Sequence, residues 1–152
     1  MHLRILSIIV FLPLFCLAQK DYKYSTKSKS AIKSFEKAAS AYDYKKYEEA
    51  LTFLNDAIKE DDNFIEAHMM MGDVYADTKD FANSVVHYRR AIEIDPGFFP
   101  QNFFNLAKSE MRIEKYEDAK THLDKFLSFS KISPALKMKA DRMMAGHRRT
   151  IR

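Results

Sequence analysis

Apolar and small residues recur at offsets of 0, +3, +4 and +7 along most of the chain, which is the spacing of one face of an α-helix. One such face comprises Phe35, Ala38, Ala39 and Tyr42. Short polar turns interrupt the helical pattern near residues 43–46, 77–80 and 114–115. Since no segment shows sustained alternation with a period of two, we expect no strands. The pattern predicts an all-α chain built from consecutive helix pairs.

The helical pattern itself repeats about every 34 residues, as the positions of Ala50, Ser84 and Ala119 show. We expect three units, at 31–63, 64–97 and 98–131, each with two antiparallel helices. Small residues are expected where the two helices approach closely, because a bulky side chain there would force them apart. The positions expected to maintain the repeat, by close contact, by packing or by ending a helix, are Ala39, Ala50, Gly72, Tyr75, Ser84, Ala91, Pro96, Ala107 and Ala119.

This spacing resembles the tetratricopeptide repeat. The middle unit carries the family's residues Met71, Gly72, Tyr75, Ser84, Tyr88, Ala91, Asp95 and Pro96. The third unit departs from the family pattern, because Glu110 replaces the usual aromatic residue and Phe126 the usual alanine. The resemblance covers residues 31–131. It implies a right-handed α-α superhelical solenoid of three helix pairs plus a C-terminal capping helix.

Residues 1–18 have the pattern of a signal peptide. Arg4 supplies a positive charge, residues 5–15 are mostly apolar, and small residues precede a cleavage site after Ala18. The apolar run is shorter than the roughly 20 residues that a membrane-spanning helix needs. Lipid attachment at Cys16 and an uncleaved anchor are the alternatives to cleavage. The pattern predicts an exported protein.

The segments on either side of the repeats have different expected roles. Residues 19–30 are polar and rich in lysine and serine, which favours a polar tether. Residues 132–152 are expected to form a capping helix and a basic tail, with Ser133 as the N-cap and Pro134 at the first helical position. A solenoid needs such a helix to cover its last apolar surface.

The composition argues against catalysis and against bound cofactors. The chain has 3 glycines and a single cysteine, which lies within the predicted signal peptide. No nucleophile or metal-binding motif is present, so we expect no enzyme activity, no metal, no cofactor and no small-molecule substrate. The run His68-Met69-Met70-Met71 suggests copper, but four consecutive helical residues point in different directions. Packing and groove lining are the better interpretation.

The tetratricopeptide resemblance implies a concave groove, lined by the first helix of each unit, that binds a peptide or helix of another protein. Phe104 and Tyr44 are its expected anchors. The alternative is that these residues pack against the capping helix or a neighbouring domain. Carried over position by position, the groove residues are Glu36, Tyr44, Glu66, Met69, Met70, Asp73, Phe104, Asn105, Lys108 and Arg112.

Ser40 and Met70 stand where some members of the family use asparagine to clamp a C-terminal carboxylate. A cytosolic receptor for chaperone tails is therefore not expected. Basic residues at both ends of the chain are compatible with contact to an anionic membrane surface or an acidic partner, although such runs more often form only a solvated face. Nucleic acid is not an expected partner, because an exported chain rarely meets it.

The whole layout resembles the N-terminal module of envelope proteins from Bacteroidetes-type bacteria, in which such repeats precede a β-propeller and an OmpA-like domain. Neither of those domains lies within these 152 residues, so cell-wall binding is not carried over. The resemblance implies a truncated relative of these proteins or a stand-alone adaptor. We expect it to act as a scaffold or adaptor in the periplasm or at the outer membrane, with an envelope or secretion-machinery protein as its partner. The alternative is a structural spacer or self-associating module whose groove is filled by its own C-terminal helix.

Overall fold

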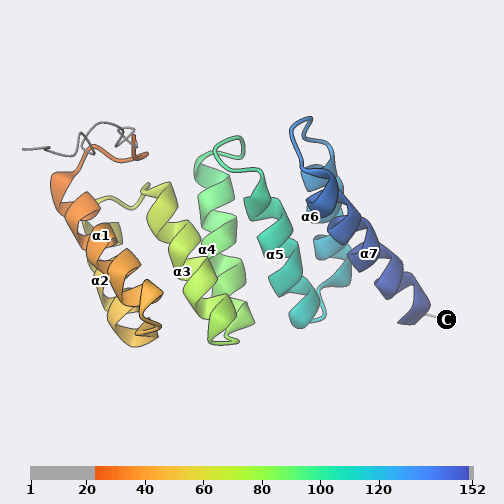
Figure 1. Ribbon diagram of the computed structural model, residues 1–152, viewed down its shortest axis with the longest axis horizontal. Coiled ribbons are helices and arrows are strands. Elements are labelled where there is room, and N and C mark those ends of the chain that lie inside the picture. Colours follow the sequence, from red (N-terminus) through yellow and green to blue (C-terminus); the bar gives the residue numbers. More distant parts are fainter. Residues whose placement is uncertain (1–22, 151–152) are drawn as a thin grey trace, which may run out of the picture.

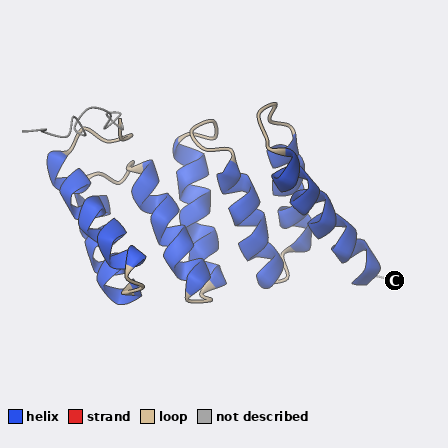
Figure 2. Cartoon of the chain, in the orientation of Figure 1, coloured by secondary structure: helices blue, strands red, loops and turns tan. Residues whose placement is uncertain are grey.

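The computed structural model describes residues 23–150, and this part of the chain consists of helices joined by short turns (Figure 2). The expected all-α fold is confirmed, with no strand in the described residues. The seven helices are α1 (Lys29–Asp43), α2 (Tyr47–Glu60), α3 (Ile65–Asp77), α4 (Phe81–Ile94), α5 (Gln101–Arg112), α6 (Tyr116–Leu127) and α7 (Pro134–Thr150).

The helices form two rows. Helices α1, α3, α5 and α7 follow one another across the front of Figure 1, and α2, α4 and α6 lie behind them. Helices α1 and α2, α3 and α4, and α5 and α6 form antiparallel pairs, and each pair packs on the next. The arrangement is the expected right-handed superhelical solenoid. We call the front row, formed by α1, α3, α5 and α7, the groove face.

Small residues lie at the tight contacts between helices. Ala50, Ala91 and Ala107 are fully buried, as is the hydroxyl-bearing Ser84. Gly72 lies very close to α4, since a Cβ atom built on it would lie 2.7 Å from ring carbons of Tyr88. The neighbouring helix thus limits the size of the side chains that point toward it.

The turn within each helix pair has the same backbone conformation in all three pairs. Lys45, Lys79 and Glu114 have φ angles of 57°, 66° and 62°, in the left-handed region. The residue after each one donates its N–H to a carbonyl near the end of the preceding helix, as Asp80 does to Tyr75 at 2.8 Å. These turns reverse the chain within three residues and fix the antiparallel pairing.

The segment just before α1, expected as part of a polar tether, is instead packed on the body of the molecule. The ring of Tyr24 lies 5.6 Å from that of Phe35 and 5.9 Å from that of Phe64. Ser25 donates to the carboxylate of Glu66, and the Ile65 N–H donates to Ser25 Oγ at 3.0 Å. Residues 24–28 therefore form a strap across the N-terminal ends of α1 and α3. The predicted signal peptide lies outside the described residues.

Helix α7 closes the other end of the row. Ser133 caps it as the sequence predicts, because the Leu136 N–H donates to Ser133 Oγ at 3.3 Å. Ala140 is fully buried in the cluster that contains Phe104 and Phe126. No helix within residues 23–150 is long and apolar enough to cross a bilayer.

Candidate functional site

The groove face contains a cavity of about 510 Å³ between α3 and α5, which we call the groove cavity. Helix α4 forms its floor and α7 contributes one side chain to its wall. Aromatic, sulfur-containing and charged side chains all line it. The lining residues are Ala76, Asp77, Lys79, Phe81, Tyr88, Asn105, Lys108, Ser109, Met111, Arg112 and Met143.

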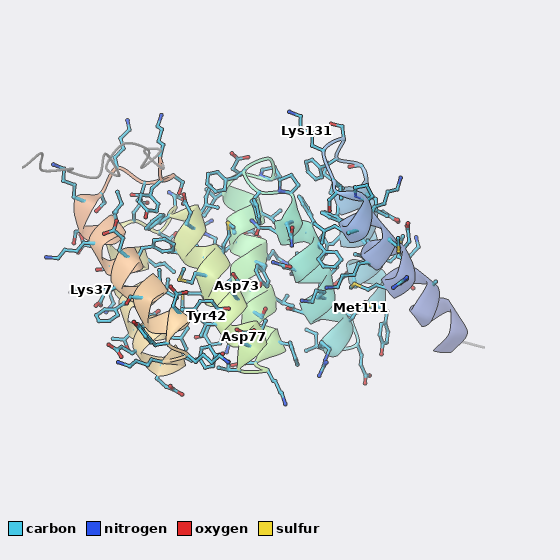
Figure 3. All side chains as sticks on the ribbon, viewed as in Figure 1. Lys37, Tyr42, Asp73, Asp77, Met111 and Lys131 are labelled. Carbon is cyan, nitrogen blue, oxygen red and sulfur yellow. The ribbon has the colours of Figure 1, made fainter. Side chains whose placement is uncertain are left out.

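Two carboxylates lie one helical turn apart on α3, at one side of the groove. Figure 3 shows Asp73 and Asp77 close to Tyr42 of α1. The Tyr42 hydroxyl donates to Asp77 at 2.8 Å, and the Tyr88 hydroxyl donates to Asp73. These acceptors and burial raise the pKa of both tyrosines, burial being the larger cause. Burial also raises the pKa of Asp73, while the bond from Tyr88 and the charge of Lys108 oppose that shift.

Three cations line the groove cavity on its other sides. Lys108 and Arg112 lie one turn apart on α5, and Lys79 lies in the turn after α3. The Arg112 guanidinium lies 4.6 Å from the centre of the Phe81 ring. Within residues 23–150, none of the three forms an ion pair with a carboxylate. The groove therefore presents cations that no carboxylate pairs with in the described residues, next to an aromatic floor.

The structure separates the expected groove residues into three groups. Asn105, Lys108 and Arg112 line the groove cavity, and Asp73 bonds to Tyr88 in its floor. Glu36 and Tyr44 are exposed on α1 and just after it, and Met69 and Met70 are half-buried on α3. The remaining two, Phe104 and Glu66, are buried.

The expectation that Phe104 is an exposed groove anchor is wrong. Its side chain is only 2% exposed, because it packs on Phe126 and beneath α7. The ammonium group of Lys139 on α7 lies 5.8 Å from its ring centre. The alternative interpretation, packing against the capping helix, describes Phe104.

Glu66 is also withdrawn from the groove, and it is 6% exposed. The backbone N–H and the hydroxyl of Ser25 donate to its carboxylate, so the strap before α1 satisfies this charge. Nothing in the helical pattern of the units indicates this contact, because it joins α3 to a segment outside the repeats.

The sequence analysis missed two side-chain contacts, and both involve the same pair of repeat positions. In the middle unit, the ring of Tyr75 lies 5.5 Å from that of His87 with an angle of 14° between them. In the third unit, the equivalent residues Glu110 and His122 form a contact of 2.7 Å. The sequence did contain a signal for the second contact, because Glu110 replaces the usual aromatic residue at a position opposite His122.

Glu110 is fully buried, and Arg89 of the preceding unit contacts its other carboxylate oxygen at 3.1 Å. The carboxylate therefore joins α4, α5 and α6. This network is structural, since it lies between helices and all its groups are paired with one another.

A pair of histidines connects α3 to α4. His68 Nδ1 and His87 Nδ1 lie 3.3 Å apart, and His68 Nε2 lies 3.0 Å from the carbonyl oxygen of Asp62. Within the described residues, no group of three or more His, Cys, Asp or Glu side chains is arranged to hold a metal ion. His68 contacts His87 and does not face the three methionines that follow it, so these four residues do not form a set of copper ligands.

Comparisons with known proteins agree with this architecture. The tetratricopeptide repeat model matches residues 65–98, which span α3 and α4. No curated protein sequence matches the chain significantly.

Three solved structures illustrate the similarity of the fold. The first tetratricopeptide domain of Spaghetti (RPAP3), bound to the HSP90 peptide SRMEEVD, has a TM-score of 0.72 and 16% identity, over 83% of this chain and 96% of that one. The tetratricopeptide domain of Arabidopsis OM64 has a TM-score of 0.70 and 17% identity, over 78% and 96%. The TPR2B domain of yeast Sti1, in a pHsp70 complex, has a TM-score of 0.68 and 17% identity, over 78% and 95%.

Identities this low show the fold alone. Together with the match at residues 65–98, they confirm that the chain contains a tetratricopeptide repeat and has the fold of a tetratricopeptide repeat protein.

Proposed function

We propose that the chain is a non-enzymatic adaptor that binds a segment of another protein in its groove. The observation that supports this is the groove cavity itself, which combines an aromatic floor with unpaired cations on α5. Interfaces of this kind bind through buried aromatic anchors inside a polar rim. Two of the similar structures contain bound partners, an HSP90 peptide and pHsp70, which makes peptide binding a reasonable extension to this chain.

A crosslinking experiment in the native cell tests this proposal. A photo-crosslinking amino acid replaces Lys108 in the groove and, as the control, Val86, which is 57% exposed and does not line the groove cavity. We expect one partner protein to be captured from position 108 and not from position 86. The crosslinked segment is then synthesised as a peptide for binding measurements.

The affinity of that peptide provides the decisive measurement. Arg112→Glu reverses a groove charge and should weaken binding about tenfold or more, whereas Lys45→Glu, in an exposed turn outside the cavity, should leave it unchanged. Circular dichroism establishes that both variants remain helical. Equal affinity of the two variants would contradict a groove site. Crosslinks confined to the chain or to a second copy would favour the spacer.

The spacer alternative, in which α7 fills the groove, has less support. Helix α7 continues the row beside α5 and α6 at the end of the molecule (Figure 1). In the described residues it reaches the groove cavity only through Met143. The space between α3 and α5 remains open to a partner.

We also propose that the adaptor acts in the bacterial cell envelope, in the periplasm or at the outer membrane, for an envelope or secretion-machinery protein. The support is the signal-peptide pattern at residues 1–18, together with the resemblance of the layout to Bacteroidetes envelope modules that carry β-propeller and OmpA-like domains. Mass spectrometry of the chain purified from envelope fractions should give an N-terminus at Gln19, and Ala18→Arg should prevent that cleavage. An intact chain in the cytosolic fraction would contradict export.

A further inference from the structure

A second cavity, of about 290 Å³, lies between α6 and α7. Its wall is largely apolar and is formed by Met111, Tyr116, Ala119, Leu123, Met143 and Met144. Figure 1 shows that α7 diverges from α5 toward its C-terminal end. Ala140 is fully buried, Met143 and Met144 one turn later are half-buried, and Ala145 and Gly146 are exposed.

The chemistry of this cavity suits an apolar group. The two charged residues at its edge, Lys120 and Asp124, pair with each other at 3.3 Å and leave no unmatched charge. Apolar cavities hold water poorly and accept apolar groups of matching size. The three methionines add flexible side chains that adapt to different shapes.

The α6–α7 cavity adjoins the groove cavity. Met111 and Met143 line both cavities, so these two side chains lie at the boundary between them. Figure 3 shows Met111 on the side of α5 that faces α7. A segment in the groove that reaches Met111 or Met143 therefore lies next to the α6–α7 cavity.

We propose that the α6–α7 cavity is a specificity pocket that takes one bulky apolar side chain, of the Phe or Leu type, from the segment bound in the groove. This inference rests on the proposed adaptor function. Charged residues of the groove would orient the segment, and the buried apolar side chain would supply a large part of the affinity, as central anchors do in other interfaces. The pocket distinguishes segments with such a side chain from those without it.

A titration with toluene, the side-chain analogue of Phe, tests the pocket without any partner. The methionine methyl groups of the full chain are labelled with ¹³C, and their NMR shifts are followed. We expect saturable shifts at Met111, Met143 and Met144, and none at Met69 or Met70 on α3. Acetamide, a polar probe, should shift none of them. Absence of a toluene response at the three cavity methionines would overturn the pocket.

A matched pair of substitutions tests the link to the groove. Met144→Trp fills the cavity without altering the groove cavity, which Met144 does not line. Met138→Trp is the control, because Met138 is 52% exposed on the same helix and lines neither cavity. Peptides selected from a random display library on the natural chain should share one bulky apolar position. Met144→Trp should weaken them about tenfold or more, and Met138→Trp less than twofold.

The outcomes separate this inference from the proposed function. Peptides that shift Met69 or Met70 but bind Met144→Trp normally would leave the groove function standing and overturn the pocket. Failure to select any groove-binding peptide would count against the adaptor function, and the toluene titration would still decide the cavity. Dimerisation of the natural chain that Met144→Trp abolishes would assign the cavity to a second copy and overturn the inference.

Discussion

Gly72 sets the distance between α3 and α4, and replacing it offers a test of the packing at a single residue. A Cβ atom there would lie 2.7 Å from Tyr88, whose buried ring is held by the hydroxyl bond to Asp73. Gly72→Ala should therefore lower the free energy of unfolding by about 1–3 kcal/mol, despite the better helix propensity of alanine. Chemical denaturation gives the value.

Gly146→Ala is the matched control for this change, since both glycines are helical. Apart from the backbone of its own helix and its chain neighbours, no heavy atom of the described residues lies within 4 Å of a Cβ built on Gly146. Alanine there should raise the free energy of unfolding by up to about 1 kcal/mol, because it lowers the entropy of the unfolded chain. If the two substitutions changed stability in the same direction, the close contact at Gly72 would not be the cause.

Phe104 and Glu66 show what the helical pattern can and cannot predict about the groove. The pattern correctly indicates that both residues lie on the first helices of their units, but it carries no information about which segment covers each helix. Phe104 is covered by α7, and Glu66 by Ser25 of the strap. Both coverings come from outside the repeats, whereas the small residues at helix contacts are constrained within the repeat and could be predicted. A groove assigned by repeat position alone includes residues that other segments have already buried.

At the scale of the elements, the turns within the helix pairs carry backbone strain that a glycine would relieve. Glu114 has a φ of 62°, which costs a residue with a side chain about 1 kcal/mol relative to glycine. Glu114→Gly should therefore raise the melting temperature. Lys115→Gly, one position later at a φ of −82°, should lower it, because glycine there only adds entropy to the unfolded chain. Equal effects on the melting temperature would exclude strain in this turn.

The histidine pair makes the contact between α3 and α4 dependent on pH. The Asp62 carbonyl can only accept, so His68 Nε2 carries the proton and His68 Nδ1 accepts from His87 Nδ1–H at 3.3 Å. Burial lowers the pKa of His68, and burial together with the nearby His68 lowers the pKa of His87 from 6.5 to about 4. The native contact therefore requires neutral histidines.

The sign of the pH effect follows from the lowered pKa of both histidines. The unfolded chain binds protons at its histidines from about pH 6.5 downward, while the folded chain resists until about pH 4. The free energy of unfolding should therefore be highest above about pH 6.5 and should fall by about 2 kcal/mol as the pH is lowered to about 4. His87→Phe introduces the residue found at the equivalent position 53 and should flatten this part of the profile. Urea unfolding at a series of pH values measures both chains, and an unchanged slope in the variant would exclude His87 as the source.

At the scale of the whole molecule, a solenoid is stable only when its last apolar surface is covered. Helix α7 provides that cover, since Phe104 and Phe126 are buried beneath it. The same helix forms one wall of the α6–α7 cavity through Met143 and Met144. Stability and the proposed specificity pocket therefore depend on different parts of α7. The part up to Ala140 covers the core, and the part with Met143 and Met144 lines the α6–α7 cavity.

Two truncations separate these roles of α7. A chain ending at Ile132 would expose the phenylalanine cluster, so we expect its free energy of unfolding to fall by about 4 kcal/mol and its binding of an apolar dye to rise. A chain ending at Gly146 keeps Ala140 and the cavity methionines and should retain nearly full stability. If the shorter chain stayed stable and bound added groove peptides more tightly, α7 would be an inhibitory segment that occupies the groove. Lower stability without tighter peptide binding would assign α7 to capping, and the groove would then be open to a partner in the intact chain.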